Sequence, residues 1–440
     1  MGALTFARAM DAGRLGTMAA VSRLIACTLA SICGIGAGVG VSQAAPKTVD
    51  PRVLAESFFA APTADRERIL AELAPFDQVA AADVDGWRKS LIGWAVKHGP
   101  RFGGKAKAYL YEKPDRGLYL TGGKKGAEAL LIALHGGGVG AGDAASAASA
   151  FGGAASTLGL RMVAPEVLEK TEHGWTDPPE TERFVLDLIE ATIRAEKLDR
   201  NRVVLTGHSM GGYGTWTLGA VHADLFAGLA VFAGAPTCTR VSPSAPISGV
   251  DDGILPNLRN LPIFVYQSGD DRNVPPESND FALPELDRLA KADPGGYVHR
   301  YDRVEGRGHA FPEKGVEAGL RFATSRARDP RPKKTVWQPS RAWKTQFYGL
   351  YWDRPALGTI VTVEAKGANT FDVTASGPTD GLEILLDARN ADLAQDVVVT
   401  SAGKEVFRGR AKPSLRTMLR TSERCDPDLF FTTSVPATIR

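Results

Sequence analysis

The stretch VVLTGHSMGGYG, residues 203–214, decides the fold prediction, because a run of β-forming apolar residues meets a glycine-rich turn there. Ser209 is the centre of a G-x-S-x-G pentapeptide that Gly207 and Gly211 close. A serine on a tight strand-to-helix turn needs glycine on both sides, because the backbone and the next helix pass very close to each other. The stretch therefore predicts a strand before Ser209, a helix after it, and a nucleophilic role for its hydroxyl.

Strand and helix patterns alternate on both sides of this turn. Residues 108–111 and 117–120 have the pattern of an antiparallel pair, and helical patterns cover 144–158 and the segment that follows Pro179. Short apolar runs typical of buried strands lie at 129–134, 162–164, 229–232, 263–267 and 297–303. Such alternation predicts an α/β fold, in which helices cover both faces of a mainly parallel sheet.

A chain of 440 residues is longer than one hydrophobic core usually supports, so we expect more than one domain. Its composition divides it into five segments. The predicted segments are a signal peptide (1–44), a helical accessory segment (45–104), a catalytic α/β domain (105–326), a basic, proline-containing linker (327–340) and a β-rich C-terminal domain with one short helix (341–440). We find no chemistry in the helical segment and expect it to serve packing.

The first 44 residues have the features of an export signal. Arg14 and Arg23 precede an apolar run of small residues, and Ser42-Gln43-Ala44 offers a small-x-small cleavage site. The chain is therefore expected to be exported to the periplasm or the extracellular space. The alternative is an uncleaved membrane anchor, and only then would the protein have a membrane partner.

Charge and cysteine content exclude several classes of partner and site. The formal net charge of +2 comes entirely from the leader, so the remainder is neutral and predicts no nucleic-acid partner. Outside the leader only Cys238 and Cys425 remain, which leaves one disulfide or two free thiols equally open. Neither has a C-x-x-C neighbour, so no structural zinc site is expected.

A serine hydroxyl needs a base to accept its proton, and that base is usually a histidine oriented by a carboxylate. Both candidates follow Ser209 in chain order, each after a predicted strand. Asp270 and Asp271 lie in the turn after 263–267, and we choose Asp271 as the acid. Of the seven histidines, His309 alone follows a late strand in a glycine-flanked loop, so it is the predicted base.

Acyl transfer also needs backbone N–H groups that bind the tetrahedral anion. Met210, the residue after the serine, is expected to supply one, and Gly137 in the loop His135-Gly136-Gly137-Gly138 the other. His208, beside the nucleophile, and Trp175 are expected to line the substrate pocket. This chemistry requires no metal and no cofactor.

Residues 105–325 resemble the α/β-hydrolase superfamily, and the segment GHSMGGYGTW, residues 207–216, is similar to one branch of it. That branch contains prolyl-oligopeptidase-type peptidases, feruloyl esterases and polyhydroxybutyrate-depolymerase-like esterases. Its acid lies in a segment similar to H-G-x-x-D-x-x-V-P, and alignment with residues 267–275 places that acid at Asp271. Gln267 and Ser268 replace the usual His-Gly.

The resemblance implies a serine hydrolase of small-molecule carboxylic esters that works through an acyl-enzyme at Ser209. Two alternatives stay open. One is a serine peptidase that cleaves short peptides. The other is a non-catalytic protein that keeps the hydrolase fold and binds surfaces through its β-rich C-terminal domain.

Overall fold

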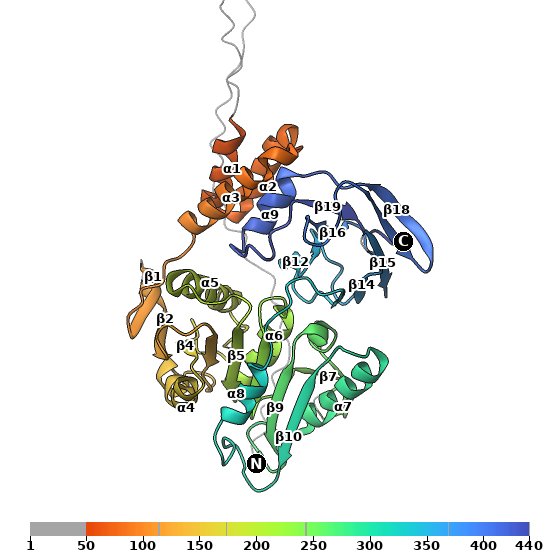
Figure 1. Cartoon of the computed structure of the whole chain (residues 1–440). Coiled ribbons are helices and arrows are strands. Elements are labelled where there is room, and N and C mark those ends of the chain that lie inside the picture. Colours follow the sequence, from red (N-terminus) through yellow and green to blue (C-terminus); the bar gives the residue numbers. More distant parts are fainter. Residues whose placement is uncertain (1–49, 113–114, 173, 243, 368, 440) are drawn as a thin grey trace, which may run out of the picture. The chain divides into compact units, whose positions relative to one another are not determined.

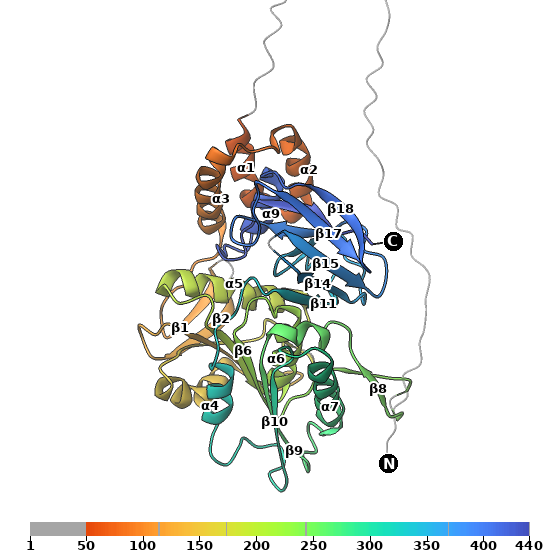
Figure 2. The same cartoon turned by 45° about the vertical axis from the view of Figure 1, so that its right-hand side comes forward.

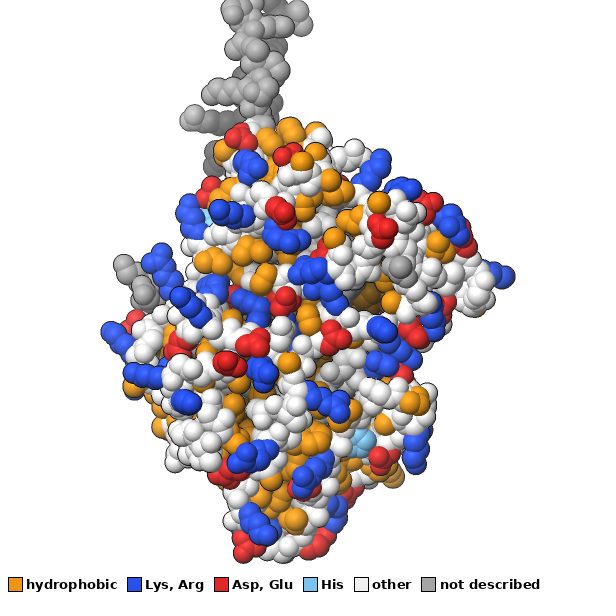
Figure 3. All heavy atoms as spheres, viewed as in Figure 1, with side chains coloured by type: hydrophobic (Ala, Val, Ile, Leu, Met, Phe, Trp, Pro, Cys, Tyr) orange, Lys and Arg blue, Asp and Glu red, His pale blue; other side chains and the backbone are white. Residues whose placement is uncertain are grey.

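The computed structural model describes residues 50–112, 115–172, 174–242, 244–367 and 369–439. Residues 49–440 form one compact unit. The predicted signal peptide and its cleavage site lie outside the described residues. None of the described helices is both long and apolar enough to span a bilayer. Acidic and basic side chains are interspersed over the face that Figure 3 shows, in keeping with the small net charge.

The central part of the chain forms an eight-stranded sheet (Figure 1). Its strands lie in the order β1-β2-β4-β3-β5-β6-β9-β10. β2 pairs antiparallel with β1 and β4, and the other neighbours pair in parallel. The strands are β1 (Lys107–Glu112), β2 (Asp115–Gly123), β3 (Leu130–Leu134), β4 (Arg161–Pro165), β5 (Val203–His208), β6 (Gly228–Phe232), β9 (Ile263–Ser268) and β10 (His299–Val304). The predicted α/β-hydrolase type of sheet is confirmed.

Helices cover both faces of this sheet, as the alternating side chains of β3 show. Leu131 and Ala133 belong to the apolar cluster that includes α4 and α8. Ile132 and Leu134 belong to the opposite cluster, which includes α5, α6 and α7. The helices are α4 (Ala144–Thr157), α5 (Pro179–Glu196), α6 (Met210–Val221), α7 (Glu277–Ala292) and α8 (Glu317–Ala323).

The N-terminal helical segment packs on a helix from the other end of the chain. Phe58 and Leu91 share an apolar cluster with Met418 and Leu419. The first two come from α1 (Pro51–Ala60) and α3 (Val84–His98), and the last two from α9 (Leu415–Ser422). The segment also contains α2 (Thr63–Leu73) and the short 3-10 turns Ala74–Phe76 and Ala81–Asp83. A packing role was predicted, but its partner α9 was not.

The C-terminal region forms two sheets, visible at the upper right of Figure 2. The first has the order β11-β14-β15-β17-β18 and the second β12-β13-β16-β19. The strands are β11 (Lys334–Trp337), β12 (Gln346–Phe347), β13 (Leu350–Trp352), β14 (Val361–Ala365), β15 (Thr370–Ala375), β16 (Leu382–Leu386), β17 (Asp396–Ser401), β18 (Lys404–Arg410) and β19 (Thr433–Pro436). Their apolar side chains join the cluster of α5 and α6, so the two regions share one core.

The predicted linker at 327–340 is wrong, because part of it is a strand. β11 pairs antiparallel with β14, and Trp337 is buried and stacks on Phe347. Two of the basic residues that suggested a linker, Arg328 and Arg331, have buried carboxylate partners instead. Arg328 is buried, and its Nη1 lies 2.9 Å from Oδ2 of Asp426. Composition alone cannot distinguish an exposed cation from one whose partner lies about a hundred residues away.

A short hairpin and a five-residue 3-10 helix follow β6, and the sequence patterns predicted neither. The hairpin joins β7 (Cys238–Arg240) to β8 (Ile247–Val250), and the 3-10 helix covers Pro256–Asn260. Cys238 on this hairpin and Cys425 after α9 are both free thiols. The sequence left one disulfide or two free thiols open, and in the structure Cys238 and Cys425 form no disulfide.

A buried carboxylate, Asp224, joins the sheet region to the C-terminal region. Its side chain is 0% exposed, and its Oδ1 lies 2.9 Å from Nζ of Lys344. Arg424 pairs with the other oxygen, and the backbone N–H of Tyr348 donates to it at 3.3 Å. Burial raises the pKa of Asp224, but the two cations outweigh burial and hold the pKa below its ordinary value.

Asp224→Asn is expected to lower the free energy of unfolding by about 3–5 kcal/mol, because the buried Lys344 and the partly buried Arg424 lose their counter-charge. Urea unfolding followed by tryptophan fluorescence measures the change. Glu72→Gln is the control, since the Arg68–Glu72 pair is exposed and should contribute at most about 0.5 kcal/mol. Equal effects of the two substitutions would contradict a stabilising role for the buried cluster.

Candidate active site

Ser209 occupies the turn between β5 and α6 in a strained backbone conformation. Its φ is 58° and its ψ is −123°, a region that non-glycine residues rarely adopt and that costs of order 1–3 kcal/mol. A Cβ on Gly207 would overlap the carbonyl of Gly211, and one on Gly211 would overlap the carbonyl oxygen of Leu134. The two glycines therefore allow β3, β5 and α6 to approach closely enough to hold Ser209 in this conformation.

Gly211→Ala is expected to lower kcat/KM by about 100-fold, because the backbone must shift and Ser209 shifts with it. The same overlap should destabilise the protein by about 1–3 kcal/mol. Gly93→Ala is the matched control, since a Cβ at this exposed position on α3 meets no atom within 4 Å. It should leave kcat/KM unchanged and stabilise the helix by about 0.5–1 kcal/mol. Ester hydrolysis and thermal unfolding of both variants provide the comparison.

The structure brings Ser209, His309 and Asp271 into one hydrogen-bonded series. Nε2 of His309 lies 2.9 Å from Oγ of Ser209, and its Nδ1 lies 2.8 Å from Oδ2 of Asp271. Ser209 follows β5, Asp271 follows β9 and His309 follows β10. The carboxyl ends of these three parallel strands lie at one edge of the sheet. With the proton on Nδ1, the histidine donates to the carboxylate, and its Nε2 accepts the serine proton.

Asp271 is held as an ionised acceptor. Its side chain is 0% exposed, and Oδ1 accepts hydrogen bonds from the backbone N–H groups of Asn273 and Val274, each at 2.9 Å. Burial raises its pKa, but these bonds and His309 outweigh burial and bring the pKa below its ordinary value. Gln267, which departs from the family pattern, is buried and donates to Oδ2 of Asp271 at 3.3 Å.

Asp270 has a different position from its neighbour. Its exposed carboxylate accepts from Oγ of Ser268 and from the backbone N–H groups of Arg307 and Gly308, at 3.1 and 3.0 Å. These bonds lower its pKa to about 2. Asp270 thus stabilises the loop that contains His309 through backbone hydrogen bonds, and it makes no hydrogen bond to the histidine ring.

The glycine loop after β3 lies against the nucleophile turn. His135 is buried: its Nδ1 donates to the carbonyl of Gly136 at 2.8 Å, and its Nε2 accepts from the N–H of Val167 at 3.2 Å. Gly137 and Met210 both line the space next to Ser209. Neither backbone N–H donates to another described residue, and Met210 is the first residue of α6. Both groups can therefore bind an anion.

Two hollows of about 320 Å³ each border Ser209, and Gly137 is the other residue common to both. We call the first the α4 hollow: its further residues are Leu134, His135, Gly136, Gly142, Ser146, Ala147, Ala150, Phe151, His208, His309 and Phe311. The second is the Trp175 hollow, with Glu172, Trp175, Thr176, Met210, Tyr213, Gly214, Thr217, Thr237, Asn273 and Val274. A substrate with two parts could extend in both directions from the serine.

The two residues predicted to line the pocket border different hollows beside Ser209. His208 borders the α4 hollow and stacks on Phe311, with ring centroids 4.2 Å apart. Burial, with a smaller contribution from His309, lowers the pKa of His208 to about 4, so its ring is neutral at pH 7. Trp175 is 1% exposed and donates from Nε1 to the carbonyl of His135 at 3.1 Å, so it supports the glycine loop as well.

Sequence patterns missed several residues around the serine. Tyr213 and Thr217 follow Ser209 at spacings of four and eight, one and two turns along α6, so helical periodicity could have identified them. Phe311 lies two residues beyond His309 and packs on His208. Phe151 belongs to α4, 58 positions before the serine in the sequence, and no local pattern connects it with the site.

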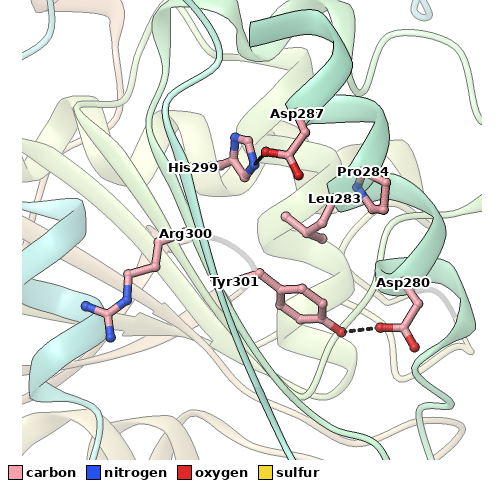
Figure 4. A pocket seen from close by; sticks show the side chains of 7 residues that line it. All are labelled: Asp280, Leu283, Pro284, Asp287, His299, Arg300 and Tyr301. Atoms are coloured by element: carbon pink, nitrogen blue, oxygen red, sulfur yellow. Dashed lines mark hydrogen bonds and ion pairs between the residues drawn. The ribbon is translucent and has the colours of Figure 1, made fainter. Parts of the chain in front are cut away.

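A further hollow, of about 430 Å³, lies between α7 and β10 (Figure 4). Four of its polar side chains form two pairs: Tyr301 donates to Asp280 at 2.8 Å, and His299 lies 3.2 Å from Asp287. It includes no residue of the site around Ser209. Within the described residues, no group of three or more His, Cys, Asp or Glu side chains could hold a metal ion.

No family model matches the chain, and no curated protein sequence is significantly similar to it. Solved structures do match, over about half of the chain. A thermostable esterase is 21% identical, with 48% of this chain and 60% of that chain covered, and a TM-score of 0.35. A carboxylesterase from Mesorhizobium loti is 16% identical, with 49% and 97% covered and a TM-score of 0.34. A phospholipase/carboxylesterase from Dyadobacter fermentans is 18% identical, with 46% and 92% covered and a TM-score of 0.33.

Proposed function

We propose that this protein is a serine hydrolase that cleaves carboxylic esters through an acyl-enzyme at Ser209. The observation that carries the proposal is the hydrogen-bonded series from Ser209 through His309 to Asp271, at 2.9 and 2.8 Å. Distances of this length place a base within reach of the hydroxyl proton and a carboxylate within reach of the base.

The proposed reaction has two halves. In the first, His309 takes the proton of Ser209 while Oγ attacks the acyl carbon, and the resulting oxyanion accepts from the N–H groups of Met210 and Gly137. His309 then returns the proton to the departing alcohol, and the acyl group remains on Ser209. In the second half, His309 activates a water molecule that releases the carboxylic acid. Asp271 keeps the imidazole in the required tautomer throughout.

Esters are preferred over peptides on a structural ground. The described residues before β1 form the helices α1, α2 and α3, so within them no β-propeller stands in front of the site to select short peptides. The remaining rival is a protein that keeps this arrangement and binds without turnover. Binding without turnover would need neither backbone N–H groups without a described partner next to Ser209 nor a histidine 2.9 Å from its hydroxyl, so both observations support the enzyme.

A fluorophosphonate probe separates these functions. We expect the folded protein to be labelled, with the adduct found by mass spectrometry on the peptide that contains Ser209. We also expect turnover of p-nitrophenyl acetate and butyrate, and none of the corresponding p-nitroanilides. No labelling of the folded protein would reject the enzyme proposal. Faster cleavage of peptide p-nitroanilides than of esters would instead select the peptidase.

Export is also a proposal, supported by the sequence of residues 1–44. N-terminal sequencing of the mature protein is expected to begin at Ala45, directly after the Ser42-Gln43-Ala44 site. A mature chain that begins before Arg23 would contradict export by cleavage.

A further inference from the structure

If Ser209 forms an acyl-enzyme, as proposed above, the two parts of an ester must divide between the α4 hollow and the Trp175 hollow. Both border Ser209, and each has a volume of about 320 Å³, at the lower end of the range for small-molecule sites. Because their linings differ, the assignment of the acyl and alcohol parts determines the class of substrate.

The position of His309 makes this assignment. The base must return its proton to the oxygen of the departing alcohol, so that oxygen must lie within hydrogen-bond reach of Nε2. Of the two hollows, His309 borders only the α4 hollow. The alcohol part therefore enters the α4 hollow, and the acyl part extends into the Trp175 hollow, which Met210 also borders.

The Trp175 hollow presents three hydroxyl groups that have no hydrogen-bond partner among the described residues. The side chains of Tyr213, Thr217 and Thr237 make no hydrogen bond to another described residue, and all three are partly exposed. Burial raises the pKa of the Tyr213 phenol, so it stays protonated and can donate at pH 7. An apolar acyl group would cover these hydroxyls without replacing the water that they bind, and each such group costs of order 1–3 kcal/mol.

The α4 hollow is different, because its polar groups are largely paired. Ser146 donates to the carbonyl of Asp143 at 2.7 Å, and both ring nitrogens of His135 have partners. Among the described residues that line it, His208 is the exception: neither of its ring nitrogens has a hydrogen-bond partner, and its Nε2 is buried. Its other side chains are mainly apolar, among them Phe151 and Phe311. This lining suits a small apolar alcohol.

Charge narrows the acyl group further. Glu172 is exposed and is the one charged side chain among the described residues that line the Trp175 hollow. No described cation lines this hollow to bind a second carboxylate. We propose that the preferred substrates are esters of short hydroxy acids without a second carboxylate, whose hydroxyl group bonds to Tyr213, Thr217 and Thr237 in the Trp175 hollow.

Matched pairs of esters test this preference. Methyl lactate and methyl isobutyrate differ by a hydroxyl in place of a methyl group of similar size, as do methyl 3-hydroxybutyrate and methyl isovalerate. Each kcat/KM is measured by pH-stat and divided by the rate constant for hydroxide-catalysed hydrolysis of the same ester. The division corrects for the different chemical reactivity of the two esters in a pair. We expect the hydroxy ester to be preferred by about fivefold or more in at least one pair, which corresponds to the contribution of about 1 kcal/mol from one hydrogen bond.

Variants then locate the preference. The double substitution Tyr213→Phe and Thr217→Val should bring the ratio close to one. The hydroxy ester loses its hydrogen bonds, so its kcat/KM should fall, whereas the apolar ester no longer covers unpaired hydroxyls, so its kcat/KM should rise. Tyr109→Phe is the control: this tyrosine is 41% exposed on β1 and lines neither hollow. It should change neither rate.

The alcohol assignment has its own test. Ala150→Phe narrows the α4 hollow and should reduce kcat/KM for cyclohexyl lactate far more than for methyl lactate, without a change in the preference for hydroxy acids. If Ala150→Phe instead lowers kcat/KM more for esters with longer acyl groups, the acyl part occupies the α4 hollow and the assignment is wrong.

The outcomes distinguish this proposal from the proposed function. Ester turnover with ratios of one or below in both pairs, or a preference that survives the double substitution, overturns the hydroxy-acid proposal alone. So does labelling of Ser209 by the fluorophosphonate when none of the four esters is cleaved. Failure of both labelling and turnover rejects the serine hydrolase itself.

Discussion

Ser209→Ala is expected to lower kcat for ester hydrolysis by about a million-fold and to abolish labelling by the fluorophosphonate, since removal of the nucleophile of a serine–histidine pair has an effect of this size. Oγ of Ser209 is the only atom of the residue that bonds to His309. The substitution keeps Cβ and the backbone, so the protein should remain folded. Steady-state kinetics and circular dichroism measure the two expectations.

The control for this result is a serine of no proposed function. Ser156 is exposed at the end of α4, and its hydroxyl donates to the carbonyl of Gly152 at 3.0 Å. Ser156→Ala should retain full activity and labelling. If Ser209→Ala kept more than a small fraction of wild-type activity with an intact fold, another residue would have to be the nucleophile.

Asp271→Asn is expected to lower kcat by about ten thousand-fold, because an amide can present its N–H₂ to the ring and favour the wrong tautomer of His309. The lost negative charge also no longer stabilises the imidazolium that forms during attack. KM should change little, since Asp271 lines neither hollow beside Ser209. A kcat and KM measurement across pH 5–9 distinguishes this loss from a general weakening of binding.

Asp270→Asn is the matched comparison at the adjacent position. Asp270 bonds to Ser268 and to the backbone of the His309 loop, and its carboxylate is exposed. An amide oxygen can accept most of these bonds, so we expect a loss of less than about tenfold, the cost of about one weakened hydrogen bond. A collapse of activity in Asp270→Asn with Asp271→Asn unaffected would assign the acid to Asp270.

Local sequence predicted much of the site, because its determinants are local. The β-forming run before Ser209 and the glycines around it set a strand-to-helix turn within twelve residues. Asp271 and His309 each follow a strand whose apolar run is visible in the sequence. Since parallel strands place their carboxyl ends at one edge of the sheet, chain order was sufficient to predict that these residues meet there.

Sequence could not choose firmly between Asp270 and Asp271, because both lie in the same turn. The choice depends on which carboxylate the turn directs inward, and that depends on the N–H groups of Asn273 and Val274 that bind Asp271. It depends equally on Gln267, which is buried below the turn, and on the distant loop of Arg307 that captures Asp270. These partners become neighbours only after folding.

The sequence by itself determined the α/β sheet, the strand-to-helix turn at Ser209 and the order in which Ser209, Asp271 and His309 follow their strands, because each rests on patterns within a few residues. Tertiary structure alone decided that residues 334–337 are a strand, that α9 packs on the N-terminal helices, and that Cys238 and Cys425 stay unpaired. It also decided which side chains line the two hollows beside Ser209. Such features depend on contacts between residues far apart in the chain, and the free energy of those contacts leaves no periodic pattern in the sequence.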